Sequence, residues 1–448
     1  MQSTSTLKYH CPLLALSPVA SKIMPSNNNK KKNAFYAQSG GVTAVINASA
    51  CGVIETIKKN SDKIGHLYAG RNGIIGALRE DLIDTTQETQ DAISGLRYTP
   101  SGAFGSCRYR LKDFKENKVE YERLIAVFKA HNIGYFFYNG GGDSADTCLK
   151  VSQISQQMGY PIQAIHIPKT VDNDLPFTDN CPGFGSVAKY IAVSTKEASL
   201  DIASMCESST KVFILEVMGR NAGWIAAASA LAAAEAGDPP HIILFPEVPF
   251  SKEKFLDKVE KTVSQHGYCV VVASEGTKYA DGMLISGSSN IDAFGHHQLG
   301  GIAPTLAKII KDSLGFKYHW ALADYLQRSA RHIASATDVA QAYAVGRAAV
   351  EYALEGKNSV MVTIDRDDSP NYSWSLGEAS LTNIANQEKK MPKNYITSDG
   401  YGVTQEGIDY LSPLIQGEDY PPYKNGIPEY TKLKNVPVKK KLKDSFKF

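Results

Sequence analysis

The 448-residue sequence has no long hydrophobic run and almost no net charge. No apolar stretch approaches the ~20 residues that a helix needs to span a bilayer, so no contact with a membrane is predicted. Lysine and arginine number 48 and aspartate and glutamate 46, a formal charge of +2 that gives no reason to expect nucleic-acid binding. With 43% hydrophobic and 21% charged residues, the chain is predicted to be a folded globular protein of about two or three domains.

The seven cysteines form no metal-binding or disulfide pattern. No two of them are spaced as Cys-x-x-Cys and no histidines cluster beside them, so neither a zinc site nor a disulfide framework is predicted. An odd number of scattered cysteines is typical of a reducing compartment, and we expect a cytoplasmic protein. Near the start of the chain, Lys30 to Lys32 follow a weakly apolar stretch instead of preceding it. This order argues against a signal peptide and favours a disordered extension over residues 1–32.

From residue 33 onward, short apolar runs alternate with helical patterns. Such alternation predicts a doubly wound α/β protein with parallel sheets covered by helices on both faces. The predicted strands are residues 34–37, 134–138, 163–167, 212–217, 241–245, 268–273 and 359–364. The predicted helices are residues 43–59, 144–158, 187–206, 222–236, 252–265, 304–313 and 339–354. In this architecture ligands bind beyond the carboxyl ends of the strands, so the loops that follow strands carry the chemistry.

Two glycine loops follow predicted strands and precede predicted helices. They are Gln38 to Val42, with glycines at 40 and 41, and Asn139 to Ser144, with three consecutive glycines. Glycine lets backbone N–H groups approach an anion at the positive end of a helix, which suits phosphate, although a tight turn alone would also explain the first loop. Asp143 could place a carboxylate beside a metal-bound phosphate, or it could simply cap the helix, as Ser144 could. Neither loop is a Walker A motif.

A third loop, Pro168 to Asp174, carries two carboxylates and a lysine. Asp172 lies two residues before Asp174 and three after Lys169. A carboxylate can accept a proton and a lysine can stabilise charge that develops on a phosphate, so the loop suits phosphoryl transfer. The alternative is an Asx-rich turn held by local hydrogen bonds.

Three later loops add further charged residues. Arg220, in a strand-glycine-helix segment, could bind a phosphate or a carboxylate through two hydrogen bonds. Glu275 follows another predicted strand and could accept hydrogen bonds from sugar hydroxyls, and Arg328 could bind a phosphate. Taken alone, each would be a surface salt-bridge partner.

In this order the loops resemble those of the phosphofructokinase family. The two most specific motifs are Pro-x-Thr-(Val/Ile)-Asp-Asn-Asp, at 168–174, and Val-Met-Gly-Arg, at 217–220. The resemblance covers about residues 33–354. The other matching segments are Ser39 to Gly41, Gly105 to Arg108, Gly140 to Ser144, Pro246 to Val248, Glu275 and Gln327-Arg328.

The resemblance implies an enzyme of two Rossmann-like α/β domains with the active site in the cleft between them. Residues 33–184 plus about 332–412 would bind the phosphoryl donor, residues 185–331 would bind fructose 6-phosphate, and the Pro- and Lys-rich residues 413–448 would form a solvated, partly ordered arm. Transfer to the C1 hydroxyl would give fructose 1,6-bisphosphate. The resemblance also implies Mg²⁺ as cofactor and a homodimer or homotetramer.

The resemblance assigns roles to individual residues. Asp172 would be the general base, and Lys169 and Asp143 would complete the catalytic set. The sugar phosphate would be bound by Thr170, Val171, Asp172, Met218, Gly219, Arg220, Glu275, Tyr325, Leu326, Gln327 and Arg328. The donor would be bound by Gly41, Arg108, Gly140, Gly141 and Ser144. A further arginine for the sugar phosphate is not placed by the motifs, and Arg331 and His332 are the candidates.

Two residues predict diphosphate as the donor. Relatives that use ATP have glycine where this chain has Asp143 and Lys169. The Asp143 carboxylate would crowd and repel the α-phosphate of a nucleotide and leave room for diphosphate, while Lys169 would stabilise the charge of the transferring group. Because Gly142 fills the position of the family's usual Asp or Asn, Asp143 is the expected Mg²⁺ ligand and Asp174 the second choice. The alternatives are an ATP-dependent enzyme and a non-catalytic regulatory subunit, against which the intact Asp172, Arg220 and Glu275 argue.

Overall fold

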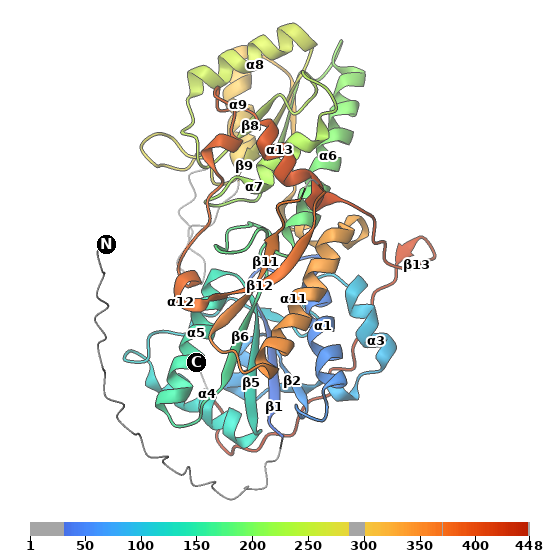
Figure 1. Ribbon diagram of the computed structural model, residues 1–448. Helices are drawn as coiled ribbons and strands as arrows, with labels where there is room; N and C mark the ends of the chain where they lie inside the picture. Colours follow the sequence, from blue (N-terminus) through green and yellow to red (C-terminus); the bar gives the residue numbers. More distant parts are fainter. Residues whose placement is uncertain (1–30, 286–300, 370, 447–448) are drawn as a thin grey trace, which may run out of the picture. The chain divides into compact units, whose positions relative to one another are not determined.

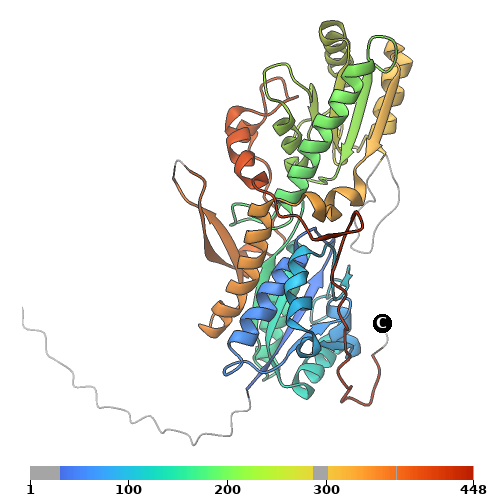
Figure 2. The same ribbon diagram turned by 90° about the vertical axis from the view of Figure 1, so that its right-hand side faces the viewer.

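The computed structural model describes residues 31–285, 301–369 and 371–446, which contain two larger β-sheets and one small hairpin (Figures 1 and 2). The first sheet has the strand order β12-β11-β6-β5-β1-β2-β3, with β4 pairing with β1, and the second has the order β10-β7-β9-β8. All pairs are parallel except β2 with β3 and β11 with β12, at the two edges of the first sheet. The predicted disordered extension, residues 1–32, lies outside the described residues except for its last two.

The strands of the first sheet are β1 (Asn33–Ser39), β2 (Leu67–Gly70), β3 (Leu82–Asp84), β4 (Ser106–Cys107), β5 (Ile133–Gly140), β6 (Gln163–Pro168), β11 (Val360–Arg366) and β12 (Trp374–Ser380). Those of the second are β7 (Val212–Val217), β8 (Ile242–Leu244), β9 (Cys269–Ser274) and β10 (Tyr318–Leu322). The hairpin consists of β13 (Tyr423–Lys424) and β14 (Ile427–Pro428).

The longer helices are α1 (Ile46–Lys59), α4 (Lys118–Ala130), α5 (Gly142–Gln157), α6 (Phe184–Met205), α8 (Lys252–His266), α9 (Ile302–Leu314) and α11 (Ala336–Leu354). The shorter ones are α2 (Ile74–Arg79), α3 (Gln90–Gly95), α7 (Trp224–Ala228), α10 (Asp324–Ser329), α12 (Leu381–Ile384) and α13 (Gln405–Leu411). Among the described residues, no helix is both long and apolar enough to cross a membrane.

Both faces of the first sheet are buried. On β1, Phe35 belongs to the hydrophobic cluster that contains residues of α4 and α5, while its neighbour Tyr36 belongs to the cluster that contains residues of α1 and α11. Figure 1 shows these two helix pairs on opposite sides of the sheet. On β7 of the second sheet, Ile214 and Leu215 likewise belong to different clusters. Since successive strand residues point to opposite faces, the predicted doubly wound fold is confirmed.

The predicted strands and helices are present, with one partial exception. Residues 222–236 were expected to form one helix, but α7 ends at Ala228 and a single 3-10 turn continues only to Ala232. The chain then turns, and the Asp238 carboxylate accepts hydrogen bonds from the backbone N–H groups of Ala234 and Glu235. This local pairing competes with helix formation, a common behaviour of aspartate.

The C-terminal arm is more ordered than we expected. The backbone N–H of Val438 donates to the carbonyl of Leu82 and the N–H of Asp84 donates to the carbonyl of Val436, so the arm runs along the edge strand β3. Leu442 and Phe446 pack against the first hydrophobic cluster. Hydrogen bonds to the open sheet edge therefore hold the backbone of the arm that we expected to be solvated and partly ordered, and most of its described lysine side chains are exposed.

Residues 391–415 pack with the second sheet. Met391, Leu411 and Leu414 are buried in a cluster with Leu215 and Val272 of that sheet. The predicted division of the chain into domains stays a prediction. It assigned residues up to about 412 to the domain of the first sheet, and the packing of Met391 and Leu411 with the second sheet is the observation relevant to that boundary.

Candidate active site

Three loops meet at one edge of the first sheet. Strands β6, β5 and β1 are adjacent and parallel, so the loops after Pro168, Gly140 and Ser39 leave the sheet side by side. The second sheet does the same with β10, β7 and β9, which precede the segments at Asp324, Met218 and Glu275. The topology thus gathers the predicted residues into two groups, one for each sheet.

The first glycine loop is held by contacts with its neighbours. Gly40 has φ of +75°, a left-handed conformation that favours glycine. Its N–H donates to the carbonyl of Cys107, and its carbonyl accepts a hydrogen bond from the hydroxyl of Ser106. The Nζ of Lys169 donates to the carbonyl of Gly41 at 2.6 Å. The loop is therefore fixed before any ligand binds.

Three cations surround Gly41. A Cβ atom added there would lie 2.7 Å from Nη1 of Arg328 and 3.9 Å from Nη2 of Arg108. Burial and the charge of Arg328 lower the pKa of Lys169 to about 8, with a smaller contribution from Arg108. We call Arg108, Lys169 and Arg328 the cation cluster. Like charges held this close repel one another, and an anion at Gly41 would relieve the repulsion.

The second glycine loop opens helix α5, whose N-cap is Gly141 with no side-chain cap. Asp143 and Ser144 both lie inside the first turn, so neither caps the helix, as the sequence had suggested they could. Within the described residues, the Asp143 carboxylate makes no hydrogen bond or ion pair, and its carbonyl accepts a bond from Thr147. A carboxylate without a partner at this loop is available to a ligand or a metal ion.

The first and third glycines of this loop differ in the space beside them. A Cβ at Gly140 would lie 2.0 Å from Oγ of Ser144, whereas a Cβ at Gly142 would have no heavy atom within 4 Å. Gly140 is therefore required by close packing. Gly142 is not required in this way, because a larger side chain, including an aspartate, would fit at that position without a clash.

The third loop presents two carboxylates. Asn173 has φ of +54°, and its buried side chain accepts a hydrogen bond from the N–H of Cys181 and donates one to the hydroxyl of Tyr410. These bonds to residues outside the loop fix its turn. The N–H of Asp172 donates to the hydroxyl of Thr170. The loop is therefore held by bonds to residues outside it as well as by local ones, and these bonds leave both aspartate carboxylates for chemistry.

The carboxylates of the site are harder to ionise than usual. Burial raises the pKa of Asp172 to about 6, with the Glu275 charge adding to the effect and Lys169, Arg220 and Arg328 opposing it. Burial and the Asp172 charge raise the pKa of Asp174 to about 7. Burial also raises the pKa of Glu275 to about 7, against the charge of Arg220. Groups that titrate near neutral pH are suited to proton transfer.

The loop after β7 packs tightly against the loop after β9. Gly219 has φ of +133°, and its carbonyl accepts a hydrogen bond from the hydroxyl of Ser274. A Cβ at Gly276 would lie 1.9 Å from the carbonyl oxygen of Arg220. The buried amide of Gln327 accepts a hydrogen bond from the N–H of Met218, which ties α10 to the same loop. Met218, Gly219, Arg220, Glu275 and Gln327 are thus brought together, as predicted.

The other residues predicted to bind the sugar phosphate differ in burial, and not all of them lie where a ligand could reach their side chains. Val171 is buried in a hydrophobic cluster, so its side chain faces the core. Tyr325 and Leu326 are 60% and 65% exposed on α10. Arg331, a candidate for binding the sugar phosphate, is fully buried and donates to the carbonyls of Arg97 and Asp419. It is therefore committed to structure, and His332, which is exposed, is the remaining candidate.

One residue near the site had no signal in the sequence. Glu388 lies beyond the segment that resembles the family, accepts two hydrogen bonds from the amide of Asn221, and adds to the raised pKa of Asp174. No motif marks it, because its contact with the site depends on how distant parts of the chain pack.

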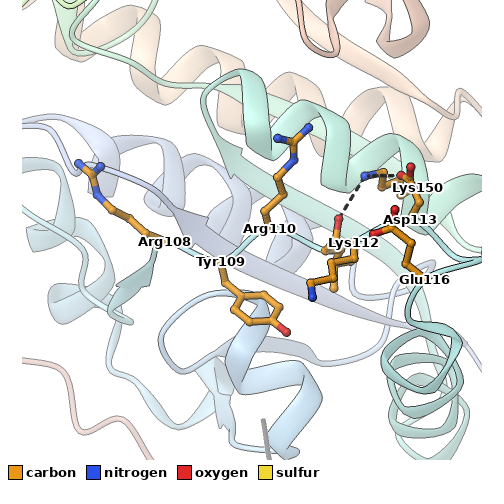
Figure 3. Close-up of a pocket in the computed structure, with 8 residues that line it drawn as sticks. Arg108, Tyr109, Arg110, Lys112, Asp113, Glu116 and Lys150 are labelled. Carbon is orange, nitrogen blue, oxygen red and sulfur yellow. Dashed lines mark hydrogen bonds and ion pairs between the residues drawn. The ribbon is translucent and has the colours of Figure 1, made fainter. Parts of the chain in front are cut away.

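A cavity of about 500 Å³ adjoins the site at Arg108 (Figure 3). Arg108 points away from the far end of the cavity, where Lys150 pairs with Asp113 at 3.0 Å. The complete lining is Arg108, Tyr109, Arg110, Leu111, Lys112, Asp113, Glu116 and Lys150. Most of these side chains are charged, and such a surface offers little apolar contact to a purine base.

The model of the phosphofructokinase family matches residues 33–353. The chain belongs to the phosphofructokinase family. Two similar relatives are named "Pyrophosphate--fructose 6-phosphate 1-phosphotransferase". One, from Halomonas elongata, is 65% identical over 92% of this chain and 98% of its own length. The other, from Methylococcus capsulatus, is 64% identical over 93% of this chain and 99% of its own length.

A solved structure agrees with this membership. The crystal structure of a pyrophosphate-dependent phosphofructokinase from Nitrosospira multiformis superposes with a TM-score of 0.86 and is 65% identical, covering 93% of this chain and 100% of that one. The family that the motifs predicted is therefore confirmed, together with its fold.

Proposed function

We propose that this chain transfers a phosphoryl group reversibly from diphosphate to the C1 hydroxyl of fructose 6-phosphate, giving fructose 1,6-bisphosphate and phosphate. The observation that carries the proposal is the cation cluster at Gly41 beside the titratable carboxylate of Asp172. The names and high identity of the relatives support the same donor and acceptor.

In the proposed reaction Asp172 acts as the general base. It takes the proton of the C1 hydroxyl, the hydroxyl oxygen bonds to the terminal phosphorus of diphosphate, and the bond from that phosphorus to the bridging oxygen breaks. Inorganic phosphate leaves. Lys169 and Arg108 stabilise the charge spread over the transferring group. Arg220 and Glu275 hold the sugar, and Gly41, Gly140 and Gly141 let the donor approach the backbone.

Mg²⁺ is the proposed cofactor. In the part of the chain that the structure describes, no three acidic, histidine or cysteine side chains come together as a complete metal site. Magnesium is usually bound by one or two carboxylates together with substrate phosphates, and the unpartnered Asp143 carboxylate fits that pattern. Asp143 would hold the ion, with Asp174 as the second candidate. When bound, the ion neutralises phosphate charge.

Asp143 also decides between diphosphate and ATP in this proposal. Its carboxylate lies in the first turn of α5, directly after the glycine loop, where it would repel a third phosphate. Asp143→Gly is expected to change the ratio of kcat/KM for diphosphate to that for ATP by about 100-fold or more, because like-charge contacts cost several kcal/mol. Asp143→Asn, which keeps the bulk and removes the charge, separates the two causes.

The test is a donor assay of the purified wild type and both variants with fructose 6-phosphate. A wild type that prefers ATP would exclude the proposed donor. A wild type that turns over neither donor would favour the regulatory-subunit alternative.

We also propose a cytoplasmic homo-oligomer. Strand β10 forms an outer edge of the second sheet, and its Trp320 and Leu322 are 42% and 40% exposed. The exposed Tyr325 and Leu326 follow directly on α10. An open edge strand with large apolar side chains is a surface that proteins commonly cover, and a second copy of the chain is the proposed cover.

A further inference from the structure

His166 is a fully buried histidine near the second glycine loop. It lies on β6, two residues before the strand ends at Pro168, and its Cα is paired in register with that of Tyr138 on the neighbouring strand β5. Ala164, two residues earlier, belongs to the hydrophobic cluster that contains residues of α5. Residues two apart on a strand share a face, so the His166 ring faces α5, the helix whose N-cap is Gly141.

The polar atoms of this ring have no hydrogen-bond partner. Within the described residues, Nδ1 and Nε2 of His166 are buried without one, and so is the hydroxyl of Tyr138 beside it. An unpaired polar group in the interior destabilises a protein, and native structures keep few of them. A leucine or a methionine would fill the same space without this cost. The histidine is therefore better explained by a hydrogen bond that forms in another state of the protein.

His166 is neutral at neutral pH. Burial and the charge of Lys169 lower its pKa to about 3, and backbone groups of Gly141 and Gly140 oppose this effect. A carbonyl oxygen favours the protonated ring, so these backbone groups are the carbonyls of the glycine loop, and they lie near the ring. A neutral imidazole carries one N–H donor and one acceptor nitrogen. The donor of His166 can therefore serve a loop carbonyl.

The carbonyls of Gly140 and Gly141 decide where the loop presents its N–H groups. The Gly140 carbonyl accepts a hydrogen bond from the N–H of Lys169, and the Gly141 carbonyl accepts two from the beginning of α5. In a planar trans peptide the next N–H points the opposite way, so the N–H of Gly141 points away from β6 and that of Gly142 points out from the start of α5. Glycine itself restricts these peptides little, so their orientation depends on such bonds.

We infer that His166 is a positioning residue of the second glycine loop: when diphosphate binds, the ring N–H donates a hydrogen bond to a carbonyl of Gly140 or Gly141 and holds the loop N–H groups toward the donor. This inference rests on the proposed function and adds to it a residue that touches neither substrate. Because the bond is absent from the free protein and forms with the donor, its free energy adds to donor affinity.

The experiment compares donor binding with thermal stability. The magnesium complex of imidodiphosphate, a diphosphate analogue that resists cleavage, is titrated without sugar into the full-length wild type, His166→Leu and His166→Gln. The KM values for diphosphate and fructose 6-phosphate and the melting temperature are measured in parallel. His131→Gln is the matched control, because His131 is also buried but precedes β5, at the opposite end of that strand from Gly140, and pairs with Glu80.

His166→Leu is expected to weaken imidodiphosphate binding and to raise the KM for diphosphate by about five- to ten-fold, the effect of about one hydrogen bond, with the KM for fructose 6-phosphate within about two-fold of wild type. Its melting temperature is expected to stay the same or to rise, because leucine removes unpaired polar atoms from the interior. His166→Gln keeps an N–H donor and should recover part of the loss. His131→Gln should leave both KM values within about two-fold of wild type.

A second measurement uses the wild type and does not depend on how His166→Leu folds. The ring N–H proton of His166, identified by its absence from His166→Gln, is followed by NMR while the magnesium complex of imidodiphosphate is added. Formation of the hydrogen bond is expected to move this proton to lower field and to slow its exchange with water.

The inference is overturned if His166→Leu binds imidodiphosphate as the wild type does, or if the ring proton of the analogue-bound wild type is unchanged. A buried water shared by His166 and Tyr138 would give this result. A lower melting temperature of His166→Leu with an equal rise in both KM values also overturns it, because that pattern shows a structural role. Failure of the proposed function looks different, since the wild type itself would then not use diphosphate as a donor.

Discussion

The two sheets differ at their outer edges and in how their halves of the site are built. Edge strand β3 of the first sheet is covered by the chain's own C-terminal arm, whereas edge strand β10 of the second presents Trp320 and Leu322 to solvent. The proposed donor-binding loops on the first sheet are held by backbone hydrogen bonds and a buried lysine. The proposed sugar-binding segment on α10 lies next to the bare edge.

If the proposed function holds, this difference leads us to expect that one chain completes the donor half of the site by itself. Loops fixed by internal bonds need no partner to hold their geometry, since little ordering remains to be done on binding. The sugar half ends at a surface that a second copy is proposed to cover. Four experiments would break or sharpen this contrast, beginning with the one expected to have the largest effect.

Replacing the proposed base should have the largest effect. Asp172→Asn keeps the size of the side chain but removes the proton acceptor, and general-base catalysis contributes about 10²- to 10⁴-fold. We expect kcat to fall by about 10³-fold with little change in either KM. Steady-state kinetics at saturating diphosphate and fructose 6-phosphate measure the effect.

Asp312→Asn is the control, because it removes an exposed carboxylate of α9 that has no role in the proposed site. A kcat of Asp172→Asn that stays close to that of this control would argue against a general base at position 172.

The pH dependence of kcat/KM should reflect the ionisation of both Asp172 and Lys169. The pKa of Asp172 is raised to about 6, so below pH 6 the base becomes protonated and kcat/KM should fall by about 10-fold per pH unit. The pKa of Lys169 is lowered to about 8, so above pH 8 the lysine loses its charge and the rate should fall again. A bell-shaped profile with limbs near these values is expected.

Lys169→Arg tests the alkaline limb. Arginine stays charged to a much higher pH, so its profile should keep the acidic limb and lose the fall above pH 8. An alkaline limb that is unchanged in this variant would mean that another group causes it.

The position of the loops on the first sheet could be predicted from sequence because its determinants are local. Glycines at 40 and 140, Lys169 and Asp172 lie in short motifs directly after strands, and the parallel order of β6, β5 and β1 brings those motifs together. The doubly wound fold followed from apolar strands buried on both faces, as β1 and β7 are.

Other features depend on contacts between residues distant in sequence. Nothing local places Arg328 against Gly41, or marks Glu388 as a neighbour of Asp174. Arg331 lies three residues after a motif arginine and could be taken for a ligand, yet burial gives it a structural role. The many lysines of the C-terminal arm led us to predict a solvated segment. Composition indicates that the lysine side chains are exposed, but it cannot reveal the backbone hydrogen bonds between the arm and β3.

A charge placed on the exposed edge strand β10 of the second sheet should disrupt the proposed oligomer. Trp320→Glu places a carboxylate on the exposed edge strand β10, where it would oppose burial against a second copy. We expect the oligomer to dissociate to monomer, with little change in the melting temperature of the chain itself. Light scattering after gel filtration measures the mass, and Lys311→Glu, on an exposed position of α9, is the control. A wild type that is already monomeric would remove the contrast between the two edges.

At the edge strand β3, which the C-terminal arm covers, a substitution should instead change the free energy of unfolding. The buried carboxylate of Glu80 accepts hydrogen bonds from the N–H groups of Lys441 and Leu442 in the arm and lies 2.7 Å from Nε2 of His131. Burial alone would raise the pKa of Glu80, but these hydrogen bonds outweigh it and the pKa is lowered. Glu80→Gln should lower the free energy of unfolding by about 2 kcal/mol at pH 7, since it removes the charge that these donors meet.

The pH dependence of this loss has a definite sign. A carboxyl group whose pKa is lowered by folding stabilises the protein above its unfolded pKa of about 4.5, and that contribution disappears as the pH falls through the lower folded value. The difference between wild type and Glu80→Gln in urea unfolding should therefore be largest at pH 7 and shrink as the pH is lowered below 4.5. Lys443→Ala, which changes an exposed lysine of the same arm, should match the wild type throughout. A difference that stays constant with pH would mean that Glu80 holds the arm through packing and not through its charge.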